Sequence, residues 1–415
     1  MPLGFYIIMA AQFFSALADN ALLIAAIALL RDMQAPAEQE PLLKLFFTIS
    51  YVALAAFVGA FADSMPKWRV MLISNTVKIG GCLMMLFGAH PLFAYAVVGL
   101  GAAAYSPAKY GILTEYLPHR LLVVANGWIE GLTVGAIILG TVLGGALIRP
   151  DWMRALVDLV PFTDSHFDVS IVMVGLLYLV AAAFNLYIPD TGVDHKPLKN
   201  NPLYLIHDFN HCLRLLWRDK LGQISLAVTT LFWGAGATLQ FIVIKWAEHA
   251  LDFDLSKASM LQGVVALGVA LGAVLAARLV SLRDSVKVIP MGIAMGLIVM
   301  VMTVVTDVDL AMVLLMLIGA CAGFFVVPMN ALLQHRGHIL MGAGHSIAVQ
   351  NFNENLSILA MTGLYALLIA FDLSVNTVIV AFGLFVAGTM LVIKRLHEAN
   401  QRQFDSAALL DDLKH

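Results

Sequence analysis

Long apolar segments recur along almost the whole chain, and they constrain its fold more than any other feature. Twelve can be marked in the 415 residues, near 5–30, 42–62, 70–89, 92–113, 122–148, 170–188, 223–245, 259–281, 288–306, 310–333, 342–371 and 375–396. About 20 apolar residues span a bilayer, and over such a length in lipid a helix satisfies its own backbone. The sequence therefore predicts an all-α membrane protein with twelve transmembrane helices.

Composition agrees with this class and disfavours several others. Charged residues make up 12% of the chain, whereas soluble proteins have about 25%. The net charge of −3 gives no general attraction to nucleic acid. Three cysteines without paired spacing indicate neither a disulfide framework nor a metal site. The sequence lacks a P-loop, a Gly-x-Ser-x-Gly elbow and a His-Glu-x-x-His motif. We therefore expect no enzymatic activity and no cofactor.

One long polar stretch divides the apolar segments into six and six. It predicts an N-terminal half (1–188), a cytoplasmic linker (189–222), a C-terminal half (223–396) and a cytoplasmic tail (397–415). An internal echo supports duplication of an ancestral half, because Pro107 precedes Glu130 by 23 residues and Pro328 precedes Asn351 by the same distance.

Loop charges indicate how the chain crosses the membrane. Lysine and arginine gather in the loops after even-numbered segments and in the C-terminal tail, whereas the loops after odd-numbered segments are mostly acidic. Basic loops stay on the cytoplasmic side, so we expect both termini in the cytoplasm. The first segment is too long for a cleaved signal peptide and is expected to remain as the first helix of a multi-pass protein.

Six ionisable residues fall inside the predicted helices, namely Asp19, Lys78, Lys109, Glu130, Lys245 and Glu354. A charge at mid-bilayer costs about 2.5–3.5 kcal/mol on insertion scales, so it normally pairs or faces a water-filled path. Asp19 could bind a substrate ammonium, carry a proton or hold a structural ion pair. Lys109 suits an anion such as a phosphate, or its side chain reaches the membrane surface.

These charges and the polar residues around them form the predicted substrate-binding set. The set comprises Asp19, Asn20, Lys78, Tyr105, Lys109, Asn126, Glu130, Gln240, Asn330, Gln350, Asn351 and Glu354. Asn126 with Glu130 and Gln350 with Glu354 are each four residues apart, which places each pair on one helix face. We predict no catalytic and no metal-binding residue.

The loop after the second segment is a candidate gate. Residues 59–69 read GAFADSMPKWR, and a glycine followed four residues later by an aspartate and then by basic residues resembles the loop signature of major facilitator transporters. This resemblance implies that Asp63 pairs with a neighbouring helix end or basic group in one gate state, with Lys67 and Arg69 beside it. The alternative is an ordinary basic cytoplasmic loop.

Longer motifs resemble one branch of that superfamily, the bacterial lysophospholipid transporters. They are residues 18–23 (ADNALL), 101–113 (GAAAYSPAKYGIL), 232–236 (FWGAG), 324–334 (FFVVPMNALLQ) and 348–351 (AVQN). The resemblance implies the major facilitator fold with two six-helix halves. It also implies that lysophosphatidylethanolamine and related lysophospholipids move from the outer to the inner leaflet of the bacterial inner membrane, by alternating access with lateral lipid entry. A separate acyltransferase would then re-acylate them.

The chemistry of such a substrate fits the binding set. A lysophospholipid has one acyl chain and a charged head, and moving the head through hydrocarbon is the costly step. We expect Asp19, with Glu130 or Glu354, to meet the ammonium, and Lys109 or Lys78 to meet the phosphate. We expect a monomer whose partners are this substrate, membrane lipid and the acyltransferase, with no nucleic acid. The alternative is a proton-coupled facilitator that exports or imports a soluble amphiphilic drug or organic ion; a lipid-modifying intramembrane enzyme is disfavoured.

Overall fold

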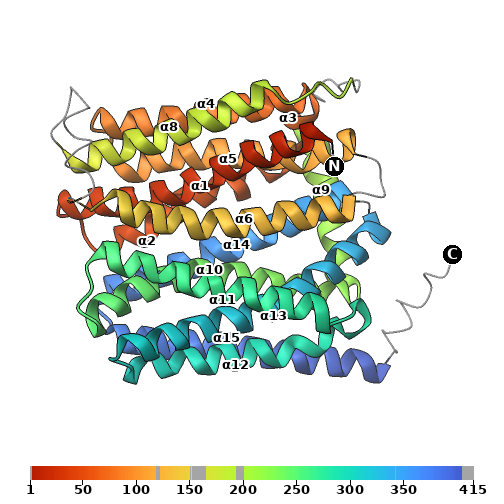
Figure 1. Ribbon diagram of the computed structural model, residues 1–415. Helices are drawn as coiled ribbons and strands as arrows, with labels where there is room; N and C mark the ends of the chain where they lie inside the picture. Colours follow the sequence, from red (N-terminus) through yellow and green to blue (C-terminus); the bar gives the residue numbers. More distant parts are fainter. Residues whose placement is uncertain are drawn as a thin grey trace. The chain divides into compact units, whose positions relative to one another are not determined.

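The protein is helical throughout the part of the chain that the computed structural model describes, which is residues 2–117, 122–149, 151, 165–192, 201–341 and 343–403. Within these ranges, ten helices are long and apolar enough to cross a membrane. Each predicted apolar segment coincides with an α-helix, except that the second (42–62) is divided between two α-helices and the ninth (288–306) ends in a short 3₁₀ helix (Figure 1). The prediction of an all-α membrane protein is therefore confirmed. The chain divides into two compact units.

The N-terminal unit contains residues 1–205 and 254–263. Its helices are α1 (Leu3–Asp32), α2 (Gln39–Ala53), α3 (Ala55–Asp63), α4 (Lys67–Leu86), α5 (Pro91–Tyr116), α6 (Leu122–Leu147) and α8 (His166–Leu186). In this unit α1 packs against α6 and α8, and α4 packs against α5 and α8. Leu22, Ile24 and Ile27 of α1 are completely buried, as expected of a helix that is apolar on every face. Asp19, which is part of α1, therefore lies inside this bundle.

The second predicted segment is broken into two helices. Leu54, with φ −105° and ψ 4°, separates α2 from α3, and both Phe57 and Val58 donate their backbone N–H groups to its carbonyl oxygen. Neither a proline nor a glycine lies between Tyr51 and Ala56 to mark this break. The helices on the two sides of the break, α2 and α3, each pack against α5.

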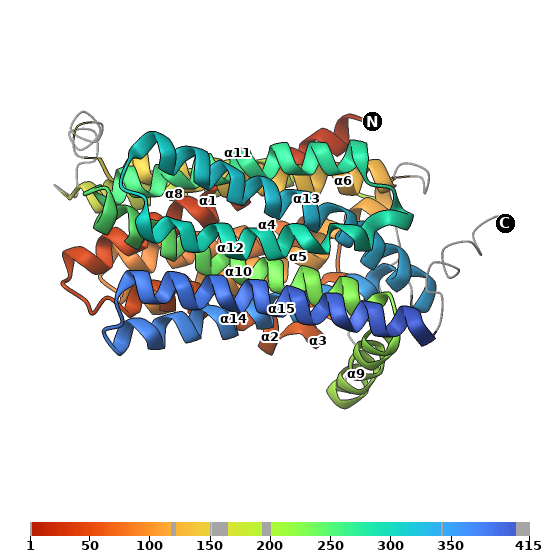
Figure 2. The ribbon, with the colours of Figure 1, turned by 90° about the horizontal axis from the view of Figure 1, so that it is seen from below.

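The C-terminal unit contains residues 206–253 and 264–415. Its elements are α9 (Pro202–Arg218, from residue 206), α10 (Gly222–Ala250), α11 (Leu255–Leu279, from residue 264), the 3₁₀ helices η2 (Leu282–Val288) and η3 (Met302–Val304), α12 (Ile289–Val301), α13 (Val308–Met341), α14 (Ala343–Ala370) and α15 (Val375–Gln403). Helix α10 packs on α13 and α14, and α12 lies beside α15 (Figure 2). Trp246 of α10 is fully buried and donates its indole N–H to the Met302 carbonyl oxygen at 2.7 Å.

Backbones of α11 and α13 touch at glycines. A Cβ atom on Gly268 would clash with the Met316 carbonyl oxygen, and one on Gly272 with the Ala320 carbonyl oxygen. The contact is reciprocal, because Gly319 and Gly323 of α13 lie against the backbone of α11 in the same way. Each helix thus carries a Gly-x-x-x-Gly pair, the spacing with which membrane helices approach most closely.

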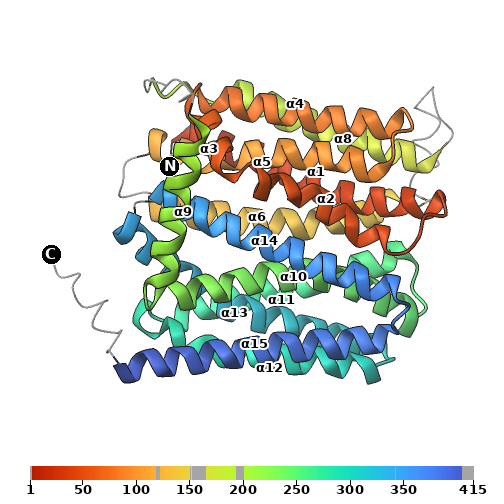
Figure 3. The ribbon, with the colours of Figure 1, turned by 180° about the vertical axis from the view of Figure 1, so that it is seen from behind.

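Helix α9 is amphipathic and docks on the C-terminal unit, running across the direction of its long helices (Figure 3). Its buried face contacts α10, α13 and α14 in one apolar cluster, formed by Phe209, Cys212, Leu213 and Leu216 with Leu226, Leu333, Leu340, Met341 and Val349. The spacing of three and four residues on α9 is that of a single helix face. Phe209 also meets Phe352 edge to face, with ring centroids 5.2 Å apart.

We expect the thiol of Cys212 to report this docking. Burial raises its pKa, and the nearby Asp208 carboxylate adds to the effect, so at pH 7 the reactive thiolate is scarcer than in a free cysteine. N-ethylmaleimide should therefore label Cys212 slowly in detergent-solubilised protein. Leu216→Glu, which places a charge in the apolar cluster, should expose the thiol and raise the labelling rate by about tenfold or more.

Labelling is measured by mass spectrometry, with Cys212→Ser to identify the modified peptide. Arg214→Glu serves as the matched control, because Arg214 is exposed on the opposite face of α9. Fast labelling of the wild-type protein, or equal rates for Leu216→Glu and Arg214→Glu, would show that α9 does not dock as described.

Candidate functional site

A buried ion pair joins α1 to α4 within the N-terminal unit. The Lys78 Nζ atom lies 2.8 Å from Asp19 Oδ2. The side chain of Lys78 is 2% exposed and that of Asp19 is 16% exposed. Two of the charges that the sequence placed inside the membrane therefore neutralise each other, and the carboxylate keeps more access to its surroundings than the ammonium does.

Neighbouring polar groups hold the pair in place. The Tyr178 hydroxyl of α8 donates to Asp19 Oδ1 at 2.6 Å, so both carboxylate oxygens are bonded. Lys78 also donates to Ser15 Oγ at 2.9 Å, and Ser15 donates in turn to Asn75 Oδ1 at 2.7 Å. Such charge-assisted bonds are the strong ones in a medium of low dielectric constant. Sequence reasoning omitted Ser15 and Tyr178 from the binding set; the four-residue spacing of Ser15 and Asp19 was the available signal for Ser15.

Aromatic rings enclose the Lys78 ammonium. Its Nζ atom lies 5.2 Å from the centroid of the Tyr105 ring and 5.5 Å from that of Tyr178. Both distances are within the range in which a cation is attracted to the face of an aromatic ring. Tyr105, predicted as a binding residue, thus lies in the same cluster as Asp19 and Lys78.

Three buried polar atoms near this cluster lack a hydrogen-bond partner among the residues that the structure describes. They are Ser74 Oγ, Asn75 Nδ2 and the Tyr105 hydroxyl. Leaving a buried donor or acceptor unpaired costs about 1–3 kcal/mol. The cluster around Lys78 therefore has spare hydrogen-bonding capacity that a water molecule or a polar ligand atom could use.

For the other predicted binding residues of the N-terminal unit, the structure shows contacts with groups outside the pair or does not describe the side chain. The Lys109 Nζ atom lies 4.4 Å from the centroid of the Tyr110 ring. Asn20 donates its amide to the Ala16 carbonyl oxygen at 2.8 Å, inside its own helix. The side chains of Asn126 and Glu130 lie outside the residues whose side chains are described.

A second polar cluster lies in the C-terminal unit, between α13 and α14. The Gln350 amide donates to Asn330 Oδ1 at 2.9 Å and to Glu354 Oε1 at 2.7 Å. Gln350 and Glu354 are both buried, and their four-residue spacing on one helix face is the geometry that the sequence suggested. Asn351 is half-buried, and Gln240 of α10 is buried at 9% exposure.

The candidate gate residues have separate surroundings. Lys67 Nζ lies 3.2 Å from Glu115 Oε1, with the lysine side chain 3% exposed, and it donates to the Ala62 carbonyl oxygen at 2.7 Å. Arg69 is exposed and lies over the Trp68 ring, 5.1 Å from its centroid. The side chain of Asp63 is outside the described set.

The structure adds an ion pair that the sequence did not reveal. Arg336 of α13 binds Asp219 with two hydrogen bonds, of 2.6 and 3.0 Å, and both side chains are at most 10% exposed. Asp219 also accepts the Gly222 backbone N–H at 2.7 Å, at the start of α10. Arg336 lies beyond the tenth predicted apolar segment (310–333), among the basic residues of the following loop. In the part of the chain that is described, no group of three or more His, Cys, Asp or Glu side chains could hold a metal ion.

Comparisons with known proteins agree on one family. A model of the Major Facilitator Superfamily matches residues 8–360. The "Lysophospholipid transporter LplT" of Yersinia enterocolitica serotype O:8 is 41% identical over 367 residues, which cover 88% of this chain and 87% of the relative. The protein of the same name from Yersinia pestis strain Pestoides F is 42% identical over 363 residues, covering 87% of this chain and 86% of the relative.

Solved structures show the same fold at low sequence identity. A bacterial homologue of the human lysosomal transporter Spinster, inward-facing and unoccupied, matches with a TM-score of 0.66 and 14% identity over 98% of each chain. The POT family transporter PepTSo matches with a TM-score of 0.69 and 12% identity, over 97% of this chain and 99% of that one.

Proposed function

Because the chain is a multi-pass membrane protein that belongs to the major facilitator superfamily, we propose that it transports lysophospholipids. The observation that carries this proposal is the similarity, over most of both chains, to relatives whose name states that substrate. The proposed direction is from the outer to the inner leaflet of a bacterial inner membrane, with lysophosphatidylethanolamine as a principal substrate. The mechanism is alternating access with lateral entry of the lipid.

The buried pair supports a role for Asp19 in receiving the substrate ammonium. Moving a zwitterionic head through hydrocarbon is costly unless protein groups replace its hydration. Asp19 is the more accessible partner of the pair, so a second cation can approach its carboxylate while Lys78 keeps the site neutral when it is empty. Lys109 meets the phosphate in this proposal, and Asn20 and Tyr105 contribute on the same two helices, α1 and α5.

Remaining polar groups take supporting roles. The proposed set in the C-terminal unit is Gln240, Asn330, Gln350, Asn351 and Glu354, and the set in the N-terminal unit also includes Asn126 and Glu130. Hydrogen bonds of Gln350 to Asn330 and Glu354 hold these three side chains together. Asp63, Lys67 and Arg69 are proposed to act in gating, and the short Lys67–Glu115 contact supports such a role for Lys67.

Loop charges and the proposed substrate together indicate the cellular setting. Both termini are proposed to be cytoplasmic, because basic residues concentrate in the same set of loops as the tail. A separate acyltransferase on the inner leaflet would consume the transported lipid. The chain is proposed to act as a monomer and to carry out transport without chemistry on the lipid.

Flipping of labelled lysophosphatidylethanolamine in proteoliposomes tests the proposal. We expect the wild-type protein to move the lipid across the bilayer, and Lys109→Ala to slow this movement at least about tenfold, because one charge-assisted bond to phosphate contributes about 1.5–3 kcal/mol. Lys287→Ala is the control, since the Lys287 side chain is 80% exposed, and it should leave the rate unchanged.

The same vesicles separate the proposal from its rival. Absence of lipid movement, together with uptake of a soluble organic cation that depends on a pH gradient, would favour a proton-coupled solute facilitator. Turnover of the lipid to a new chemical species would instead indicate an enzyme.

A further inference from the structure

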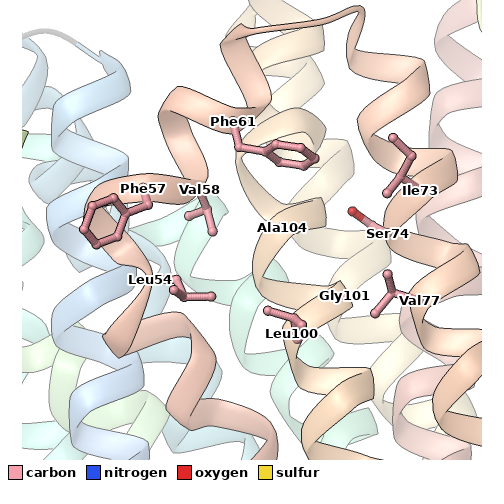
Figure 4. A pocket seen from close by; sticks show the side chains of 10 residues that line it. All are labelled: Leu54, Phe57, Val58, Phe61, Ile73, Ser74, Val77, Leu100, Gly101 and Ala104. Atoms are coloured by element: carbon pink, nitrogen blue, oxygen red, sulfur yellow. The ribbon is translucent and has the colours of Figure 1, made fainter. Parts of the chain in front are cut away.

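An apolar cavity of about 300 Å³ opens between α3, α4 and α5 in the N-terminal unit. Its lining includes Val58 and Phe61 of α3, Val77 of α4 and Leu100 and Ala104 of α5. Val58 and Phe61 face Val77 across the cavity (Figure 4). The break at Leu54, another lining residue, lies at one edge. We call this cavity the α3–α5 groove.

The size and lining of the groove select for one hydrocarbon chain. Nine of the ten residues that line it are apolar, and no ionisable side chain is among them. Pockets for small molecules range from about 300 to 1,000 Å³, so this volume is at the small end. Phe57 of α3 and Leu100 of α5 on its rim are partly exposed, and α5 is one of the helices long and apolar enough to cross a membrane. A chain of a membrane lipid can therefore enter directly from the hydrocarbon.

The polar exception in the lining is Ser74, and it points to an amphiphile rather than to a plain hydrocarbon. Ser74 is 1% exposed, its hydroxyl lies on the groove side of α4 (Figure 4), and its Oγ atom has no hydrogen-bond partner among the described residues. A buried hydroxyl without a partner is costly. An ester or glycerol oxygen at the polar end of an acyl chain would supply the missing bond.

The groove also adjoins the buried ion pair. A Cβ atom on Gly101, which lines the groove, would lie 2.7 Å from the Ser74 carbonyl oxygen and 2.8 Å from Lys78 Cγ. The stem of Lys78 thus passes directly behind the groove wall, while its ammonium binds Asp19. Ser74 and Lys78 are four residues apart on α4, so the groove and the pair are built on one stretch of helix.

We propose that the α3–α5 groove holds the single acyl chain of the transported lysophospholipid, with the Ser74 hydroxyl bonded to an oxygen at the polar end of that chain. The inference rests on the proposed function and adds to it the site that recognises the tail. A lipid with two chains would leave its second chain outside a groove of this volume. The groove accordingly favours a lysophospholipid over an ordinary phospholipid.

Filling the groove should make transport depend on chain length. The double substitution Val58→Phe with Ala104→Leu adds side-chain volume inside the groove, and we expect it to slow flipping of palmitoyl lysophosphatidylethanolamine about tenfold. Flipping of the octanoyl analogue, whose short chain needs little of the groove, should change less than about twofold. Ser74→Ala should slow both substrates to a similar extent, at most about tenfold, because it removes one hydrogen bond.

Val180→Phe is the matched control. Val180 is 40% exposed on α8 and is not among the residues that line the groove, so the same change of side chain should leave both rates unaltered. Folded variants with wild-type melting temperature that flip palmitoyl substrate at the wild-type rate would overturn the inference and leave the proposed function standing. If the wild-type protein flips neither substrate, the proposed function fails and the inference fails with it.

Photolabelling of the wild-type protein tests whether the groove binds the acyl chain, even if the variant with Val58→Phe and Ala104→Leu does not fold. A lysophosphatidylethanolamine with a diazirine at the end of its chain should cross-link to α3 and α5 around the groove, and excess unlabelled lipid should suppress the products. A diacyl phosphatidylethanolamine with the same diazirine should label these positions several-fold less. Equal labelling by the two lipids would show ordinary bilayer lipid in the groove and would overturn the inference.

Discussion

Asp19→Ala is expected to abolish transport and to lower the free energy of unfolding by about 3–5 kcal/mol, because it leaves a buried charge without its partner. The side chain of Lys78 is 2% exposed, and among the residues that the structure describes it would keep its bond to Ser15 and its contacts with aromatic rings. Tyr178 would also lose the acceptor of its 2.6 Å hydrogen bond. Thermal unfolding in detergent and lipid flipping in vesicles measure the two effects.

A double variant separates the structural role of Asp19 from its role in binding. Asp19→Asn with Lys78→Gln removes both charges together, and replacing a whole buried pair is often neutral for stability. We expect this variant to regain most of the stability while transport stays lost, because no carboxylate remains for the substrate ammonium. Recovery of transport together with stability would show that Asp19 acts only as a structural partner.

An exposed ion pair provides the control for these measurements. Lys394 and Glu398 lie 3.9 Å apart, with side chains 44% and 53% exposed. Exposed pairs contribute about 0–1 kcal/mol, so Glu398→Ala should change neither melting temperature nor transport measurably. A large effect of Glu398→Ala would mean that the assays respond to any loss of charge.

Gly272→Leu is expected to prevent formation of a stable C-terminal unit. A Cβ atom there would lie 2.8 Å from the carbonyl carbon and 2.9 Å from the Cα atom of Ala320, in addition to its clash with the carbonyl oxygen. Because these are backbone atoms, no side-chain rotation relieves the overlap, and α11 and α13 would have to separate. Overpacking of cores costs about 1–3 kcal/mol, and we expect this case to reach or exceed the upper value.

Gly388→Leu is the comparison for this change. Gly388 is also a glycine within a helix, α15, but a Cβ atom there would meet no atom within 4 Å. Size-exclusion chromatography of fluorescently tagged protein should show a folded peak for Gly388→Leu and loss of that peak for Gly272→Leu. Equal peaks with equal melting temperatures would contradict the backbone contact.

The helices of this protein could be predicted from sequence because the signal is local. A run of apolar residues long enough to span a bilayer has few alternatives to a helix. Local signals also mislead in places. Pro107 and Pro328 lie inside continuous helices, although proline usually ends or kinks a helix. The interruption that does occur, at Leu54, has no proline or glycine nearby.

The partners within the site could not be predicted, because pairing depends on how distant helices pack. The sequence offered three acidic and three basic groups inside the membrane and no rule for matching them. Asp19 and Lys78 are 59 residues apart, and Tyr178 is 159 residues from Asp19. Contacts within one helix were accessible, as Gln350 and Glu354 show. Arg336 escaped notice because α13 extends beyond the predicted apolar segment, as far as Met341.

The direct backbone contact between α11 and α13 also provides a reference distance for measurements on the transport cycle. Close-packed interiors deform in discrete steps, through layers of side chains that can adopt a second arrangement. Where glycines bring one main chain into direct contact with another, no such layer of side chains lies between them. We therefore expect the two helices to move as one rigid body. Spin labels at Leu275 and Leu317, exposed positions on these two helices, would therefore keep a constant separation against which movements elsewhere can be calibrated.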